Sequence, residues 1–333
     1  MDSLTQIVLG AAVGEAVLGK KVGNKAMLYG AIAGTIPDLD TFASYFVDTV
    51  TAIEIHRGFT HSIIFSLVLA PIFGWLISKI ERKSAANWID WSRLMFFGLF
   101  THPLLDSFTT WGTQLFWPLD IRLDLKTIFV IDPLYTLPFL IFLILAMRSK
   151  KGSEKRKKYN NLGLLVSSCY LLLCVGLKGL TYQKFVAALE DQNIAYRQLE
   201  TKPSPFNSIL WTANVELDNA YLIGNYSIFD SKPVEFERYP KDHQLLGELR
   251  SENKIQRMIE ISKGWFIVTE NEGELFFNDL RFGVLNGSAA RPNFVFSYHI
   301  VQENGGVEIK EVERKPADAK KLLVDLGNRI LGN

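Results

Sequence analysis

Residues 56–80 form the sequence HRGFTHSIIFSLVLAPIFGWLISKI, which joins a polar motif to a long apolar run. His56 and His61, two of only five histidines in the chain, stand five residues apart beside Arg57 and Gly58. The apolar run from 62 to 80 follows at once, and its length is close to that of a helix crossing a bilayer. The stretch therefore predicts a polar site at the start of a transmembrane helix.

The amino-acid composition favours a membrane protein. In a chain of 333 residues, 48% are hydrophobic and 23 are phenylalanine, which is more apolar than the average soluble domain. The long apolar segments lie before residue 181, whereas the sequence after 182 is charged and interrupted by turn residues. We predict a helical transmembrane domain with a metal site over residues 1–181 and a soluble domain over 182–333.

The first domain is predicted to be a multi-pass α-helical membrane domain. About six runs approach the length of a bilayer span, at 4–19, 26–47, 62–80, 93–117, 128–147 and 161–180. Basic residues follow the first, third and fifth runs, and the sequence RSKKGSEKRKK at 148–158 is the densest group. Because loops rich in Lys and Arg stay in the cytoplasm, we expect an inner-membrane protein whose C-terminal domain is extracytoplasmic.

The second domain is predicted to be a soluble α+β domain that contains an antiparallel sheet. Apolar runs separated by turn residues predict strands at 208–217, 219–229, 264–270, 274–280 and 293–301. Amphipathic patterns predict helices at 183–200 and near 317–331. The formal net charge of +1 gives no broad basic face, so we expect no nucleic-acid partner.

Ionisable residues from three separate segments fall in the outward half of the predicted membrane domain. Burying such groups at membrane depth is costly unless they pair, reach water or bind a cation. Imidazole and carboxylate are the usual ligands of zinc, manganese and iron, and the metal charge offsets the buried carboxylates. We therefore predict a divalent metal, most simply zinc, with candidate ligands Asp38, Asp40, His56, His61, His102 and Asp106.

The spacing of these residues supports one site. His102 and Asp106 are four apart, which places both on one face of a helix. Pro37 is expected to end a helix before Asp38, and Gly58 permits a turn in the histidine motif, with Thr60 or Ser62 as a helix cap. Structural alternatives remain open: Asp38 as a cap, His102 as a satisfied histidine at a kink, and the histidine motif as a loop that holds lipid head groups.

The order of five motifs resembles a known bacterial family. MDSLTQ at 1–6, PDLD at 37–40, HRGFTHS at 56–62, THPLLD at 101–106 and LFWP at 115–118 occur in the chain. This order resembles an inner-membrane family described as metal-dependent hydrolases and as LexA-binding, membrane-associated proteins. The resemblance covers roughly residues 1–150. Many members carry a histidine where this chain has Gln6, so the resemblance leaves an N-terminal ligand in doubt.

The resemblance implies hydrolysis of a phosphoester. The family is distantly similar to zinc-dependent phospholipase C and P1-type nucleases, whose helical cores hold zinc through H-x-x-x-D pairs, and His102 with Asp106 matches that pair. Metal would lower the pKa of bound water for attack on phosphorus. As catalytic candidates we name Asp40 as a possible general base, Arg57 for a phosphate oxygen, and Arg122 as a second arginine.

The expected partners are membrane lipids or an amphiphilic phosphorylated substrate, because the predicted site lies at the membrane interface. Two alternatives stay open. A non-catalytic scaffold or regulator would use the metal only for structure, and a transporter would use intramembrane carboxylates and broken helices as an ion pathway. No internal repeat is evident in the sequence, which argues weakly against transport.

Overall fold

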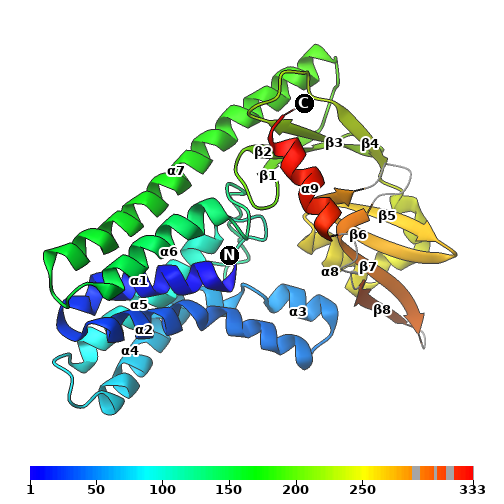
Figure 1. Ribbon diagram of the computed structural model, residues 1–333. Helices are drawn as coiled ribbons and strands as arrows, with labels where there is room; N and C mark the ends of the chain where they lie inside the picture. The colour runs from blue at the N-terminus through cyan, green and yellow to red at the C-terminus, as the bar shows by residue number, and fades with distance from the viewer. Residues whose placement is uncertain (287–292, 304–305, 313–318, 333) are drawn as a thin grey trace. The chain divides into compact units, whose positions relative to one another are not determined.

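The computed structural model describes residues 1–286, 293–303, 306–312 and 319–332. The chain divides into two compact units (Figure 1). The helical unit comprises residues 1–43, 55–176 and 205–208. The sheet unit comprises residues 44–54, 177–204 and 209–333. Each unit has its own hydrophobic core.

The helical unit is built from α-helices joined by short turns and two longer segments. Its helices are α1 (Ser3–Val22), α2 (Asn24–Thr35), α4 (Ile63–Ile80), α5 (Trp88–Asp106), α6 (Pro133–Arg148) and the first part of α7 (Glu154–Asp191). Two 3-10 segments carry polar motifs of the sequence: η1 (Pro37–Tyr45), which begins in this unit, and η2 (Phe59–His61). Helix α2 ends at Thr35, directly before the segment that Pro37 begins, as the proline predicts.

Helices α1 and α2 pack with their backbones in contact. A Cβ atom on Gly30 would stand 2.2 Å from the Gly10 carbonyl oxygen, and one on Gly34 would stand 2.5 Å from the Gln6 carbonyl oxygen. Only glycine permits so close an approach. This packing brings the N-terminal turn of α1 beside the C-terminal turn of α2, where the candidate site begins.

The prediction of a multi-pass membrane domain is wrong. Within the described residues, only α4 and α7 are long and apolar enough to cross a membrane, and α6 is apolar but has 16 residues. Helix α2 has 12 residues, and α1 buries polar groups that include Thr5 and Glu15. Many apolar residues of α1, α2 and α5 pack in two core clusters, which also include residues of α4 and α6. Much of their hydrophobicity therefore reflects packing within the helical unit.

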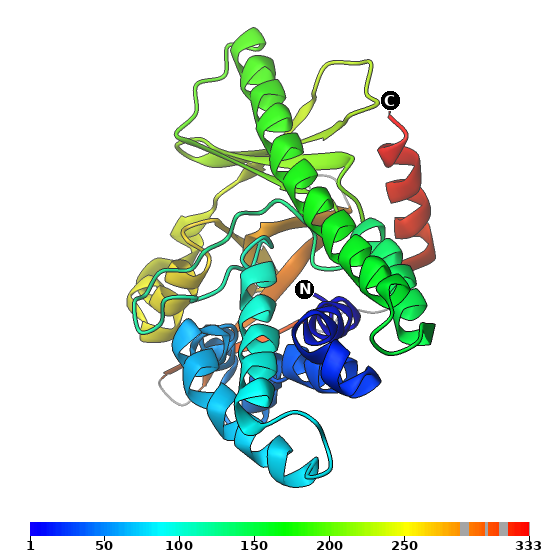
Figure 2. The same cartoon turned by 90° about the vertical axis from the view of Figure 1, so that its left-hand side faces the viewer.

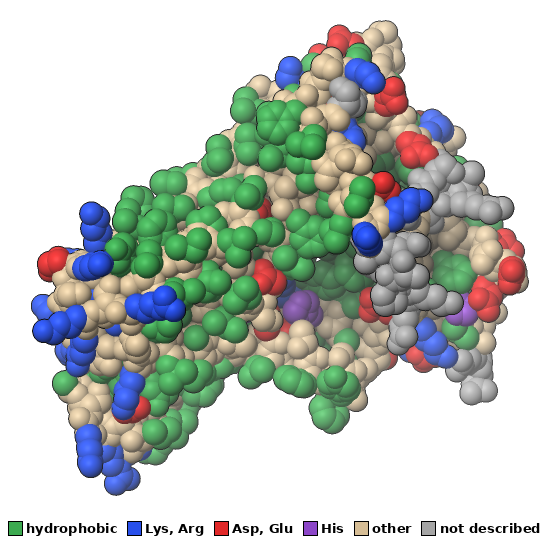
Figure 3. Space-filling model, viewed as in Figure 1, with side chains coloured by type: hydrophobic (Ala, Val, Ile, Leu, Met, Phe, Trp, Pro, Cys, Tyr) green, Lys and Arg blue, Asp and Glu red, His purple; other side chains and the backbone are tan. Residues whose placement is uncertain are grey.

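The three basic loops of the sequence meet at one end of the helical unit. Lys21 pairs with Asp90 at the start of α5, and Lys25 pairs with Glu81 at the end of α4. The Asn24 side chain donates to the Met147 carbonyl at the end of α6. Lys and Arg side chains accordingly gather at the left-hand end of the view in Figure 3.

Helix α7 differs from the prediction because it continues past the expected break near residue 181. It runs unbroken to Asp191 (Figure 2). The predicted helix at 183–200 is therefore the last part of α7, and the chain is already in a strand from Gln198.

The sheet unit contains two four-stranded antiparallel sheets, where the sequence predicted one sheet. The first has the order β1 (Gln198–Pro203), β2 (Leu210–Glu216), β3 (Ala220–Ser227) and β4 (Phe236–Pro240). The second has the order β5 (Phe266–Asn271), β6 (Glu274–Asn286), β7 (Asn293–Glu303) and β8 (Gly306–Glu311). The shorter helices of this unit are α3 (Thr49–Ile55), η3 (His243–Ser251), α8 (Asn253–Ile261) and α9 (Ala319–Ile330).

Polar contacts join the two sheets inside the sheet unit. The buried amide of Asn214 on β2 donates to the Leu280 carbonyl of β6 at 2.8 Å, and the Lys202 ammonium on β1 donates to the same carbonyl at 3.1 Å. Strands β1, β4 and β8 were not predicted. Their sequences are short and rich in charged residues, so they lack the apolar alternation on which strand prediction depends.

Candidate metal centre

The histidine motif forms a tight turn that ends in a helix cap. Arg57 adopts a left-handed backbone conformation with φ of 60°. Gly58 has a negative φ, but a Cβ atom there would lie 2.9 Å from the Ile55 carbonyl oxygen. The Ser62 hydroxyl accepts from the Phe65 amide and caps α4. The turn directs His61 inward, where its side chain is fully buried.

Helix α5 supplies the second pair. His102 and Asp106 lie one turn apart on its buried face, close to the end of the helix. A helix places residues four apart on the same side, which is the geometry that the sequence predicted. Pro103 lies between them inside the helix.

Four of the six predicted ligands converge. One ligand atom from each of Asp38, His61, His102 and Asp106 lies within 4.8 Å of the others. The Asp38 carboxylate is 3.4 Å from His61 Nε2 and 3.3 Å from His102 Nε2. The Asp106 carboxylate is 3.5 Å from both nitrogens. The group therefore combines two imidazoles and two carboxylates.

The orientation of the two imidazoles indicates a cation site. His102 Nδ1 lies 2.6 Å from the Gly34 carbonyl oxygen, which can only accept, so Nδ1 carries the proton. His61 Nδ1 lies 3.0 Å from Thr60 Oγ1 and 3.3 Å from Asp40 Oδ2, which favours a proton there too. The two Nε2 atoms then face each other across 3.1 Å. Two lone pairs at that distance repel unless a proton or a metal ion lies between them.

Asp106 offers the second indication of a cation. Its Oδ1 atom receives the N-terminal amine of Met1 and the Gln6 amide, the latter at 3.0 Å. Its Oδ2 atom is buried and accepts no hydrogen bond from the described residues, although Arg57 Nε lies 3.3 Å away. A buried carboxylate oxygen that accepts no hydrogen bond destabilises the folded protein, and coordination to a metal ion would remove that cost. The donor set therefore fits a divalent metal.

Asp40 and His56 lie beside the four-residue group. Asp40 Oδ2 accepts from the Arg57 amide and the Thr60 hydroxyl, both at 2.9 Å, while Oδ1 is 2.9 Å from His56 Nδ1. The Asp40 side chain is 2% exposed. Metal-bound histidines usually donate their second ring nitrogen to a carboxylate or carbonyl. Asp40 beside His61, and Gly34 behind His102, fit that pattern.

The two predicted arginines occupy different places. Arg57 is buried, its Nη1 atom donates to Thr109 Oγ1 at 2.8 Å, and its guanidinium faces Asp106. Arg122 is half-buried and donates to the His56 carbonyl at 3.1 Å, so it stabilises the backbone of the histidine turn. Arg57 is thus the arginine next to the four-residue group.

The pKa values show how strongly these groups are coupled. Burial acts to raise the pKa of Asp38 and Asp40, but their contacts with the histidines prevail and lower both well below the usual range. Burial acts to lower the pKa of His61, but the carboxylates of Asp106, Asp38 and Asp40 raise it to about 9. The pKa of His56 is lowered, chiefly by burial. The site thus stabilises positive charge between its carboxylates.

Several participants were not predicted from the sequence. The Gly34 carbonyl and the Thr109 hydroxyl have no motif that marks them, because their roles depend on the packing of α2 and the turn after α5. Gln6 stands at the position where the family resemblance leaves a ligand in doubt. Its amide nitrogen nonetheless bonds Asp106, and its buried Oε1 atom has no hydrogen-bond partner among the described residues.

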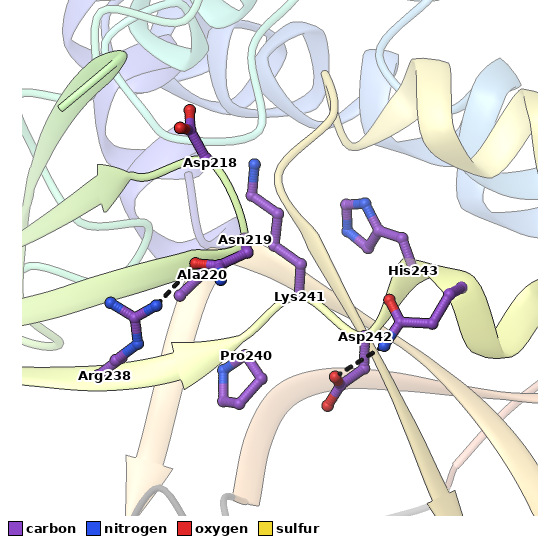
Figure 4. Close-up of a pocket in the computed structure, with 9 residues that line it drawn as sticks. Asp218, Asn219, Ala220, Arg238, Pro240, Lys241, Asp242 and His243 are labelled. Atoms are coloured by element: carbon purple, nitrogen blue, oxygen red, sulfur yellow. Dashed lines mark hydrogen bonds between the residues drawn. The ribbon is translucent and has the colours of Figure 1, made fainter.

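A pocket of about 430 Å³ in the sheet unit is separate from this centre. It lies at the β3–β4 edge and the start of η3 (Figure 4). Its polar groups bond one another: Arg238 donates to Asn219 at 2.6 Å and Gln244 donates to Asp242 at 3.2 Å. Lys241 pairs with Glu216 at 2.6 Å. We assign it no chemistry.

The fold and the site define a protein with a helical unit that carries a candidate metal centre and two candidate membrane-spanning helices, followed by a unit of antiparallel sheets. The sequence model of the YdjM inner membrane protein family matches residues 1–181. Because that match covers more than half of the chain, the chain belongs to this family of inner membrane proteins.

A curated relative agrees with this assignment. The chain is 35% identical over 101 residues to inner membrane protein YbcI of Escherichia coli (strain K12). The match covers 30% of this chain and 57% of that relative, so the chain spans little more than half the length of the relative it matches. No solved structure matches the chain. Both names describe inner membrane proteins and state no activity.

Proposed function

We propose that the chain is a metal-dependent hydrolase of a phosphoester. The observation that carries the proposal is the opposed pair of Nε2 atoms of His61 and His102, 3.1 Å apart and flanked by the carboxylates of Asp38 and Asp106. Two imidazoles and two carboxylates form a donor set that suits zinc, with manganese and iron as alternatives. A divalent ion bound there would supply Lewis-acid chemistry to hydrolysis.

The residues around the ligands have separate roles in this proposal. Arg57 provides a buried, permanently charged guanidinium 3.3 Å from Asp106, and this group suits a phosphate oxygen. Asp40 holds His61 and His56 in position through its two oxygens. Arg122 holds the histidine turn through the His56 carbonyl. The proposed substrate contact is therefore Arg57, and Arg122 is the second candidate.

We also propose that the site faces the extracytoplasmic side of the inner membrane. The basic loops meet at the end of the helical unit where α4 ends and α5 begins. His61 precedes α4, and His102 and Asp106 close α5, so the candidate ligands lie at the opposite ends of both helices. Lys- and Arg-rich loops favour the cytoplasm, which leaves the metal centre on the other side.

Metal content and turnover, measured together on the detergent-purified full chain, test the function. We compare wild type with His102→Ala and with the control His299→Ala, which removes a partly exposed histidine of the sheet unit. Metal is quantified by mass spectrometry without added metal, and turnover is measured on chromogenic phosphodiesters and on lipid phosphates. We expect wild type and His299→Ala to carry the same metal and activity, and His102→Ala to lose both.

Two other outcomes would contradict the hydrolase proposal. Bound metal that raises the thermal stability of wild type, without turnover on any substrate, would make the ion structural and favour a scaffold or regulator. A wild-type protein that purifies without metal and gains no stability from added zinc, manganese or iron would remove the hydrolase proposal.

A further inference from the structure

A hairpin beside the metal centre exposes an unusual run of apolar side chains. The backbones of Thr113 and Leu123 exchange both of their hydrogen bonds at 3.0 Å and close the hairpin. All residues from 116 to 121, sequence FWPLDI, are exposed at its tip. The one charged side chain of the tip, Asp120, accepts a hydrogen bond from Gln114 at 2.8 Å. The tip therefore presents mainly apolar surface.

The hairpin is fixed to the start of α4. The Ile63 amide donates to the Leu115 carbonyl at 3.0 Å, and the Gln114 amide donates to the Arg57 carbonyl at 3.0 Å. The ring of Phe59 lies 4.8 Å from the ring of Trp117 and 5.4 Å from that of Phe65. We call Phe59, Phe116, Trp117 and Leu119 the aromatic ledge; each has a partly exposed side chain, from 37% for Trp117 to 58% for Leu119.

The ledge is continuous with the outward face of a candidate membrane span. Helix α4 exposes Ile64, Leu67 and Val68 in its first two turns, next to Phe65, which contacts the ledge. At the other end of α4, Lys79 lies over the ring of Trp75. An 18-residue helix is about 27 Å long, close to the hydrocarbon thickness of a bilayer. Aromatic side chains at the two ends of such a helix are typical of membrane interfaces.

We propose that the aromatic ledge inserts into the bilayer interface on the side of the membrane where α4 begins. The occupant of this surface is lipid, at the boundary between head groups and acyl chains. A protein partner would be expected to meet polar or charged groups at the rim of its interface. The ledge instead continues into the apolar face of α4, and the Asp120 carboxylate at the hairpin tip already accepts a hydrogen bond from Gln114. Insertion there would hold the histidine turn at head-group depth, whether or not the centre is catalytic.

Fluorescence quenching of Trp117 in the native chain tests the proposal. The full chain is reconstituted in phosphatidylcholine and phosphatidylglycerol vesicles whose acyl chains are brominated near the head group. The signal of Trp117 is the difference between wild type and Trp117→Phe, a change that keeps an aromatic ring beside Phe59. Trp75→Phe isolates an exposed tryptophan on α4, and Trp211→Phe isolates one that is fully buried in the sheet unit.

We expect brominated lipid to quench Trp117 about as strongly as Trp75, and to leave Trp211 unaffected. If brominated lipid leaves Trp117 unquenched while it quenches Trp75, the ledge is not in the membrane and the proposal fails. Acrylamide then identifies the alternative: quenching by this aqueous probe places the ledge in water, and protection from both probes places it against protein, including a second copy of the chain. A matching Phe116→Trp variant in the Trp117→Phe background provides a second reporter at the tip.

Discussion

At the scale of single residues, Asp40 has a position that differs from that of Asp38, although both come from the same four-residue motif. Asp38 faces the two Nε2 atoms, at 3.3 and 3.4 Å. Asp40 faces Nδ1 of His61 and His56 instead, and it also accepts two hydrogen bonds from the histidine turn. One carboxylate is thus placed to bind a cation, and the other is placed to orient the histidine that binds it.

We predict that Asp40→Asn weakens metal binding by roughly 10- to 100-fold, the usual effect of losing the partner of a metal-bound histidine. An amide keeps the size of the side chain but carries no charge and can accept through only one of its two end atoms. Metal affinity is measured by competition with a chelator on the purified chain.

The control for this prediction is Asp48→Asn. Asp48 accepts from the amides of Val50 and Thr51 at the start of α3, and asparagine serves equally well at a helix cap. We expect its metal affinity to match wild type. Equal affinities in all three proteins would show that Asp40 does not position His61.

Prediction from sequence succeeded best where chemistry and spacing agree. The prediction that His102 and Asp106 share one face depends only on their lying in a helix. The prediction that a helix ends before Asp38 depends only on Pro37. The different roles of Asp38 and Asp40 depend on the direction in which each side chain points from the 3-10 segment. The spacing of residues in the sequence does not predict that direction. The contribution of Gly34 is a backbone carbonyl, for which the side-chain sequence carries no signal.

At the scale of elements, the centre depends on the contact between α1 and α2. Helix α2 ends one residue after Gly34, whose carbonyl receives Nδ1 of His102, and α1 begins with the turn that carries Gln6. The glycines of both helices allow this approach, since a Cβ atom on Gly30 would meet the Gly10 carbonyl oxygen at 2.2 Å. A shift of α2 would therefore move an acceptor of the metal centre.

We predict that Gly30→Ala destabilises the protein by about 1–3 kcal/mol, the usual cost of overpacking a close contact. The obstructing atom is a backbone oxygen, which cannot move aside as a flexible side chain can. The measurement is thermal unfolding in detergent, followed by metal content at a temperature where both proteins are folded.

Gly179→Ala is the matched control, because Gly179 lies in α7 and a Cβ atom there would meet nothing within 4 Å. Alanine is also the better helix former, so this variant should be at least as stable as wild type. If Gly30→Ala were as stable as Gly179→Ala, the two helix backbones would not be in the close contact described.

The elements also explain why the multi-pass prediction failed. Hydropathy counts apolar residues without regard to what they contact. In α5 the buried residues include Trp91, Leu94 and Leu99, which pack inside the helical unit, whereas α4 exposes most of its apolar side chains. Apolar residues that fill a protein core and those that face lipid look alike in the sequence, and only the packed structure separates them.

At the scale of the whole molecule, the positions of the basic loops bear on which ends of α4 and α7 face the cytoplasm. Both candidate spans carry basic residues at one end. Helix α4 has Lys79 in its last turn and is followed by Arg82 and Lys83, and α7 begins in a basic stretch. If both basic ends are cytoplasmic, the C-terminal end of α7, and the sheet unit that it enters, lie outside the cytoplasm.

Single cysteines placed on the two sides test this orientation. In a background of Cys169→Ala and Cys174→Ala, Asp218→Cys marks the turn between β2 and β3, where the native side chain is 81% exposed. Lys83→Cys marks the exposed basic loop after α4. The reagent is a maleimide that does not cross membranes, applied to spheroplasts before and after permeabilisation.

We predict that Asp218→Cys is labelled in intact spheroplasts and that Lys83→Cys is labelled only after permeabilisation. The physical reason is that moving the Lys- and Arg-rich loops across the membrane is unfavourable, whereas the sheet unit carries no comparable cluster in its described part.

The reverse labelling pattern would mean that the chain has the opposite orientation in the membrane. The metal centre would then lie on the cytoplasmic side, where a hydrolase would meet soluble phosphoesters as readily as lipid ones. Labelling of both positions in intact spheroplasts would mean that the basic loop is outside the cytoplasm, and charge would then not set the orientation of α4.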